Sequence, residues 1–143
     1  MNDMPDTKKM EALIKDDPAL VSQQAKFTRM QDGTLEDWMK IGAAHKADFT
    51  KTADRFIEML KQLENATLGF ACDQLQHALM CGTLARRAGA TDEQIVIALC
   101  HDIAKVINVP NHGPIAAEMM RPYISDDSYH VIRNHQAFQG EHY

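Results

Sequence analysis

An apolar helix that contains an adjacent histidine and aspartate constrains this chain more than any other feature of its sequence. Thr91 begins a capping-box pattern that predicts a helix over residues 92 to about 107. Its centre, residues 95–100, reads IVIALC and is apolar on every side, as is typical of a buried helix. His101 and Asp102 follow directly, and Asp102 falls on an apolar stripe of the helix. The sequence therefore predicts a carboxylate inside the hydrophobic core.

The remaining segments also favour helices. The 143 residues include only 7 glycines and 5 prolines, and no strand-like alternation of polar and apolar residues is visible. Periodicity, the cap residues Thr34 and Ser125 and the helix-ending Gly89 predict further helices at residues 35–45, 53–63, 73–88, 114–120 and 125–138. We expect an all-α fold, a helical bundle in which an N-terminal helical extension, residues 1–66, packs on a core formed by residues 67–143.

Composition excludes several classes of function. The formal net charge is −5, so a general nucleic-acid-binding surface is not expected, and an anionic substrate would be held locally. No apolar run approaches the roughly 20 residues that span a bilayer, and the polar N-terminus has no signal-peptide core. Cys72, Cys81 and Cys100 are odd in number and lack CxxC spacing, which favours reduced thiols, the last two buried. We expect a cytoplasmic protein without membrane contact.

Ionisable side chains from several helices are predicted to point toward the core. His77 shares a helical face with apolar residues, and His135 lines up with Val131 and Ile132. Burying an unpaired charge costs several kcal/mol, so Asp102 needs a compensating partner. A salt bridge to a lysine or arginine is one solution, and a divalent metal with imidazole ligands is the other. A mixed His and carboxylate set suits Fe, Mn, Zn or Co better than Mg or Ca.

The order and spacing of these residues resemble the HD superfamily of metal-dependent enzymes. Within it the chain is similar to the small HD proteins related to phosphonate-cleaving diiron oxygenases and, more distantly, to myo-inositol oxygenase. The resemblance extends from about Phe27 to the end of the chain. It rests on five motifs, which are residues 74–79 (QLQHAL), 100–105 (CHDIAK), 111–112 (NH), 121–125 (RPYIS) and 134–140 (NHQAFQG).

The resemblance implies a dinuclear metal site. Asp102 would bridge two metals, with His77 and His101 binding the first and His112 and His135 the second. In the oxygenase branch the metals are an Fe(II)/Fe(III) pair that uses dioxygen to cleave the carbon–phosphorus bond of a small phosphonate or to oxidise a related hydroxylated substrate. In the phosphohydrolase branch, Mn, Fe, Co or Zn activates water to attack nucleotides or small phosphate esters.

The resemblance also suggests which side chains meet a small anionic substrate. Lys105 lies three residues after Asp102 and is expected to act with it as a catalytic residue by clamping an anionic group. A lysine that only extends into solvent is the alternative. Arg133 and Gln139 flank His135 and are expected to line the pocket. His45, His130 and His142 are expected at the surface, and assembly as a homodimer stays open.

The chain departs from the family pattern in two places. Dinuclear relatives use a further Asp well downstream of the last ligand, whereas this chain ends at Tyr143, so we expect a fragment that lacks its C-terminal helices. A weakened first metal site and an exposed apolar edge would follow. Residues 67–70 (TLGF) also lack the Tyr and Glu that read the substrate amine in phosphonate oxygenases. A domain that binds a partner without catalysis is the third hypothesis.

Overall fold

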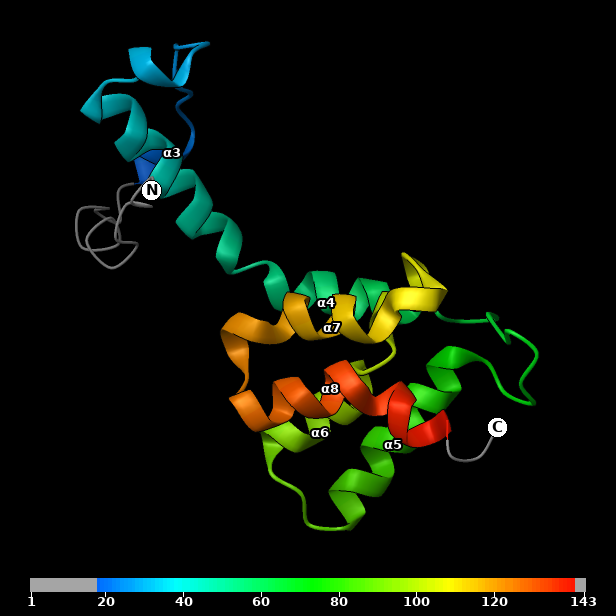
Figure 1. The fold of residues 1–143 in the computed structure, drawn as a ribbon. Helices are drawn as coiled ribbons and strands as arrows, with labels where there is room; N and C mark the ends of the chain where they lie inside the picture. Colours follow the sequence, from blue (N-terminus) through cyan, green and yellow to red (C-terminus); the bar gives the residue numbers. More distant parts are fainter. Residues whose placement is uncertain (1–17, 141–143) are drawn as a thin grey trace. The chain divides into compact units, whose positions relative to one another are not determined.

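The computed structural model describes residues 18–140, and these residues form helices and connecting turns without any strand (Figure 1). The predicted all-α fold is confirmed. The α-helices are α2 (Pro18–Val21), α3 (Leu35–Phe49), α4 (Thr52–Lys61), α5 (Gln74–Arg87), α6 (Asp92–Cys100), α7 (His112–Met120) and α8 (Asp126–Gln139). Short 3-10 turns lie at η1 (Met30–Asp32), η2 (Ile103–Val106), η3 (Val109–Asn111) and η4 (Arg121–Tyr123). None of the helices within residues 18–140 has both the length and the apolar character that crossing a membrane requires.

The chain divides into two compact units, Met1–Ala53 and Asp54–Tyr143. In the first unit, the predicted cap of α3 is present, because Thr34 and Asp37 form a capping box. The second unit includes most of α4, whose apolar residues Phe56, Met59 and Leu60 pack against its core. The boundary expected after residue 66 therefore falls inside the second unit, and packing of an N-terminal extension on the core stays a prediction.

Two antiparallel helix pairs build the second unit. Helix α5 packs on α6 and α7 packs on α8, and α6 also contacts α8 (Figure 1). Small side chains allow this close approach, since Ala78 of α5 and Ala116 and Ala117 of α7 are fully buried. The buried core consists of Ile97, Cys100, Ile103, Ala104, Ala116, Ala117, Met120 and Ile132.

Helix α6 ends earlier than its apolar pattern predicts. It stops at Cys100, and after two turn residues the chain continues as the 3-10 turn η2. At this end the Nδ1 atom of the His101 ring lies 2.8 Å from the carbonyl oxygen of Ala98, one of the last-turn carbonyls that lack a helical partner. Because the His101 side chain meets this carbonyl, the backbone can turn at the His-Asp pair.

Two further expectations are corrected. Helix α7 begins at His112 rather than Pro114, so His112 occupies its first turn. On α5, the stripe that was expected to face the core is largely exposed, with Met80 at 53% and Leu84 at 62%. Instead α5 buries the small residues Ala78 and Gly82. Helix α6 approaches so closely at Gly82 that any side chain there would collide with Leu99.

Candidate metal centre

The five residues predicted as metal ligands converge from four segments of the second unit. His77 lies within α5, His101 caps the end of α6, and Asp102 precedes η2. His112 begins α7, and His135 lies within α8. Asp102 is buried at their centre with 2% exposure, so the carboxylate predicted inside the core is there.

One carboxylate oxygen of Asp102 faces the first pair of imidazoles. Its Oδ2 atom lies 3.5 Å from Nε2 of His77 and 3.4 Å from Nε2 of His101. The two Nε2 atoms are 3.2 Å apart. Three potential ligand atoms therefore form a nearly equilateral triangle on this side of the carboxylate.

The other carboxylate oxygen faces a second pair. Oδ1 of Asp102 lies 2.8 Å from Nε2 of His112 and 3.3 Å from Nε2 of His135. These two Nε2 atoms are 3.1 Å apart. The division of the four histidines between the two oxygens is the one that the family resemblance implies.

Backbone carbonyls orient three of the four rings. The Nδ1 atoms of His101, His112 and His135 lie 2.8, 2.6 and 2.6 Å from the carbonyl oxygens of Ala98, Val109 and Ile132, respectively. In each case Nδ1 carries the proton, and a neutral ring then presents the Nε2 lone pair to Asp102. Metal-binding histidines commonly donate their other ring N–H in this way.

This arrangement concentrates electron pairs around a buried anion. Oδ1 of Asp102 accepts no hydrogen bond from any described residue, although Nε2 of His112 is only 2.8 Å away. Burial raises the pKa of Asp102, but the surrounding imidazoles of His101, His112 and His135 lower it further, to well below its usual range. Burial also lowers the pKa of His101, whereas the adjacent Asp102 carboxylate raises it more. Lys105 supplies one positive charge at Oδ2, so positive charge is missing on the Oδ1 side, where protons on the imidazoles or cations would supply it.

Metal cations satisfy this need with the donors that are present. Imidazole nitrogens and a carboxylate form a typical ligand set for Fe, Mn, Co or Zn. A cation on each side of Asp102 would pair the orphaned Oδ1 atom and separate the close Nε2 pairs. The residues therefore fit two metal ions bridged by one carboxylate.

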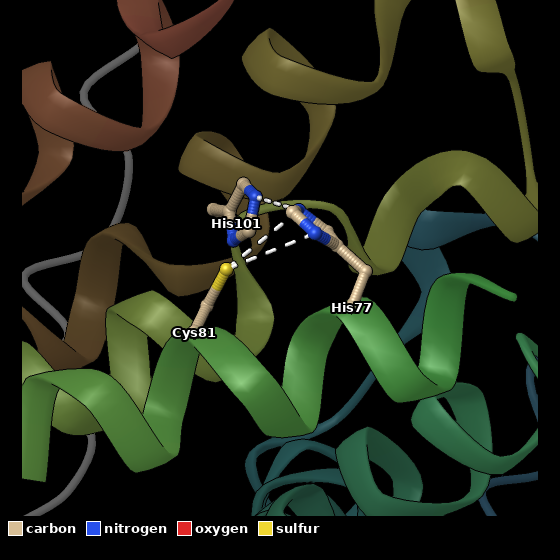
Figure 2. A group of neighbouring side chains, drawn as sticks. All are labelled: His77, Cys81 and His101. Carbon is tan, nitrogen blue, oxygen red and sulfur yellow. Dashed lines mark hydrogen bonds between the residues drawn. The ribbon is translucent and has the colours of Figure 1, made fainter. Parts of the chain in front are cut away.

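His77 differs from the other three histidines. Its side chain is 32% exposed, and its ring contacts the Cys81 thiol, with Sγ at 3.7 Å from Nε2 and 3.9 Å from Nδ1 (Figure 2). Burial lowers the pKa of His77, and the neighbouring His101 lowers it further. Burial also raises the pKa of the Cys81 thiol, as does the Asp102 carboxylate. Cys81 is half-buried, and the sequence did not single it out as a ligand.

Lys105 lies at the edge of the centre rather than in solvent. Its Nζ atom donates to Oδ2 of Asp102 and to Oε1 of Gln74, both at 2.7 Å, and its side chain is only 12% exposed. Gln74 is itself buried, and sequence reasoning did not assign it a role. The lysine thus supplies one fixed positive charge beside the first imidazole pair.

Two clefts meet at this lysine. A cleft of about 100 Å³ reaches His77 and Asp102, and a neighbouring one of about 390 Å³ reaches His112. Phe70, Lys105 and Gln139 line both of them. The structure therefore brings Lys105 and Gln139 to the space next to the ligands, as predicted, and adds Phe70 to its wall.

The remaining predicted residues lie elsewhere. Arg133 was expected in the pocket, but its guanidinium contacts Glu118 at 3.5 Å and the hydroxyl of Tyr129 at 3.3 Å, and neither cleft includes it. His45 and His130 are exposed, in agreement with a surface position. His142 lies outside the described residues.

Two residues outside the predicted ligand set help to position the ligands. A Cβ atom on Gly113 would lie 3.3 Å from the backbone oxygen of Arg133 and 3.3 Å from Cε1 of His135. Glycine at this position therefore lets α8 bring His135 beside His112. Glu93 of α6 holds the start of α8, because its carboxylate accepts hydrogen bonds from the backbone N–H and hydroxyl of Ser125 and from the hydroxyl of Ser128.

Comparisons of the chain with protein-family models, curated proteins and solved structures gave no match. The resemblance to the HD superfamily therefore rests on the sequence motifs alone.

Proposed function

We propose that this chain is a metal-dependent enzyme of the HD type that acts on a small anionic substrate. The observation that carries the proposal is the buried carboxylate of Asp102, each of whose oxygens faces a different pair of imidazole Nε2 atoms. Two-metal sites hold their ions about 3.5–4 Å apart, a separation that a bridging carboxylate permits. His77 and His101 would hold one ion, and His112 and His135 the other.

Within this class we propose a dioxygen-dependent oxygenase that cleaves the carbon–phosphorus bond of a small phosphonate or oxidises a related hydroxylated compound. An Fe(II)/Fe(III) pair, when bound, supplies the redox chemistry for such a reaction. Support comes from the short interval between His101 and His112, which resembles the oxygenase branch, and from imidazole-rich donors that suit iron.

The chain's own residues bind and orient the substrate in this proposal. The Lys105 ammonium, fixed by Asp102 and Gln74, attracts one anionic oxygen of the substrate. The Gln139 amide offers both a donor and an acceptor to a phosphonate or hydroxyl oxygen. Phe70 lies on the wall of the cleft with its ring 5.8 Å from the Lys105 ammonium, and it offers an apolar surface to the carbon part of the substrate.

The second candidate is a metal-dependent phosphohydrolase. The same histidine and carboxylate donors bind Mn, Co or Zn, and a two-metal site with an adjacent lysine suits a phosphate ester as well as a phosphonate. Residues 67–70 offer neither the Tyr nor the Glu with which phosphonate oxygenases read a substrate amine, so we do not propose an aminophosphonate as the substrate of the oxygenase.

Metal analysis and oxygen dependence test the proposal together. We expect freshly purified protein to contain transition metal, and anaerobic loading with Fe(II) followed by limited dioxygen to give a mixed-valent EPR signal. Phosphate should then be released from small phosphonates only in the presence of dioxygen. His101→Ala should abolish both results, whereas His130→Ala, an exposed histidine on α8, should preserve them.

Other outcomes decide between the alternatives. Oxygen-independent phosphate release from simple esters, lost in His101→Ala, would replace the oxygenase with the hydrolase. A protein that binds no transition metal under any of these conditions would contradict both enzymes and favour a binding domain.

A further inference from the structure

The first imidazole pair has a fourth potential ligand that the family pattern does not contain. Cys81 follows His77 by one helical turn on α5, so the two side chains rise from the same face of the helix (Figure 2). Both point toward His101, which comes from the end of α6. The ligand atoms of His77, Cys81 and His101 all lie within 4.8 Å of one another.

We propose that Cys81 is a ligand of the metal at the first position, which thus has two imidazole nitrogens, one thiolate sulfur and Oδ2 of Asp102 as donors. The inference rests on the proposed two-metal function and specifies the chemistry of one of its two positions. The ion is a divalent transition metal of intermediate softness, such as Fe(II), Co(II) or Zn(II), because a thiolate disfavours harder ions.

The distances from His77 to His101 and to Cys81 match those between donors on one tetrahedral ion. A tetrahedral ion with metal–nitrogen bonds near 2.05 Å and metal–sulfur bonds near 2.3 Å separates two nitrogens by about 3.3 Å, and a nitrogen from a sulfur by about 3.6 Å. Here Nε2 of His77 lies 3.2 Å from Nε2 of His101 and 3.7 Å from Sγ of Cys81. Oδ2 of Asp102 lies 3.5 and 3.4 Å from the two nitrogens, and the proposed ion would draw it and the thiolate together.

The thiol also has few other roles available to it. Cys81 is half-buried, and among residues 18–140 its thiol makes its polar contact with the His77 ring, whose Nε2 atom faces the Asp102 carboxylate. When the metal binds, the thiol proton leaves to solvent and the thiolate bonds to the ion, as usual for cysteine ligands. The metal compensates for both the thiolate and the Asp102 carboxylate.

The two metal positions are then chemically different. The second position, with His112, His135 and Oδ1 of Asp102, has nitrogen and oxygen donors, and no cysteine belongs to the described residues that surround it. We therefore expect a soft ion to fill the first position before the second. Mixed occupancy follows from the ligands themselves.

Anaerobic titration of the full chain with Co(II) tests the inference. We expect visible ligand-field bands from bound cobalt and, at the first equivalent, an intense sulfur-to-cobalt charge-transfer band in the near ultraviolet. Cys81→Ser should lose the near-ultraviolet band, keep visible bands and bind the first cobalt at least about tenfold more weakly. Cys72→Ser is the matched control and should keep the band, because Cys72 lines the cleft that reaches His77 but does not belong to the group of ligand atoms formed by His77, Cys81 and His101.

A second measurement needs no variant. Bound Co(II) or Zn(II) should protect Cys81 of the unmodified chain from alkylation, with mass spectrometry identifying the protected residue. Visible bands without a near-ultraviolet band, or a band that disappears in Cys72→Ser and persists in Cys81→Ser, would overturn the inference while leaving the two-metal site in place. Absence of any cobalt band would contradict the two-metal site as well.

Discussion

The Nε2 atom of His112 lies 2.8 Å from Oδ1 of Asp102, yet this buried oxygen accepts no hydrogen bond. The reason is that the His112 ring uses its Nδ1 proton at the carbonyl oxygen of Val109. Two electron-rich atoms therefore face each other in the core, where such a contact is unfavourable unless a cation or an extra proton lies between them.

Removing the charge of the Asp102 carboxylate should abolish metal binding at both positions. We expect Asp102→Asn to lower the affinity for transition metals by more than about 100-fold, because even changes in outer-shell partners cost about 10–100-fold. His135→Ala should instead leave one metal per chain, bound at the first position. Metal stoichiometry after gel filtration measures both results. An equal loss of bound metal in Asp102→Asn and His135→Ala would contradict the presence of two separate metal positions.

Gly113 should control the position of His135. A methyl group in Gly113→Ala would lie 3.3 Å from the backbone of α8 and from the His135 ring, so either must shift by a few tenths of an ångström. We expect about tenfold weaker binding of the second metal with little change at the first. Gly140→Ala is the matched control, because nothing lies within 4 Å of a Cβ atom there. Unchanged affinity in Gly113→Ala would contradict this role.

Lys105 should bind anions at the loaded site. Its ammonium is fixed beside Asp102 by two hydrogen bonds of 2.7 Å. Hydrogen bonds to charged groups contribute about 1.5–3 kcal/mol, so Lys105→Met should weaken inorganic phosphate binding by roughly 10–100-fold. Calorimetry on metal-loaded protein measures this change. Lys61→Met, an exposed lysine of α4, should leave phosphate affinity unaltered, and an equal loss there would indicate a nonspecific charge effect.

Ile132 should stabilise the fold without contributing to metal binding chemistry. It is fully buried on α8 among core residues of α7 and η2. We expect Ile132→Ala to lower the free energy of unfolding by about 2–4 kcal/mol, the usual range for such a truncation. Val131→Ala, one residue away and 57% exposed, should change it by about 0.5 kcal/mol or less. Denaturant unfolding of the metal-free proteins provides the comparison.

Glu93 should make the docking of α8 depend on pH. Hydrogen bonds from Ser125 and Ser128 lower the pKa of Glu93 below its ordinary value of 4.5. The folded state therefore favours the ionised form of Glu93. The stability that this carboxylate contributes is complete above about pH 4.5 and is lost as the pH falls through the lower pKa of the folded state. Glu93→Gln should lower the melting temperature at pH 7, and this difference should shrink below pH 4.5. A difference that stays constant down to acidic pH would show that the carboxylate charge is not involved. Asp92→Asn, in the same first turn of α6, controls for the helix dipole.

Much of the local structure could be predicted from the sequence alone. The capping residues Thr34, Thr91 and Ser125 begin their helices where the pattern predicted, and Gly89 has the left-handed backbone, at φ 75°, that ends α5. These signals act between residues a few positions apart, so they are readable without knowledge of the fold. The buried carboxylate of Asp102 was also predictable, because an apolar helix around it leaves no exposed face.

Tertiary structure decided which helix faces are buried and how the histidines are divided between the two oxygens of Asp102. The pattern of α5 favoured burial of Met80 and Leu84, but the packing of Gly82 against Leu99 turned that face outward and brought Cys81 toward the imidazoles. Arg133 follows the same helix as His135 and yet pairs with Glu118 away from the clefts. Distances between atoms of different helices depend on packing, and a one-dimensional pattern fixes the direction of a side chain only relative to its own helix.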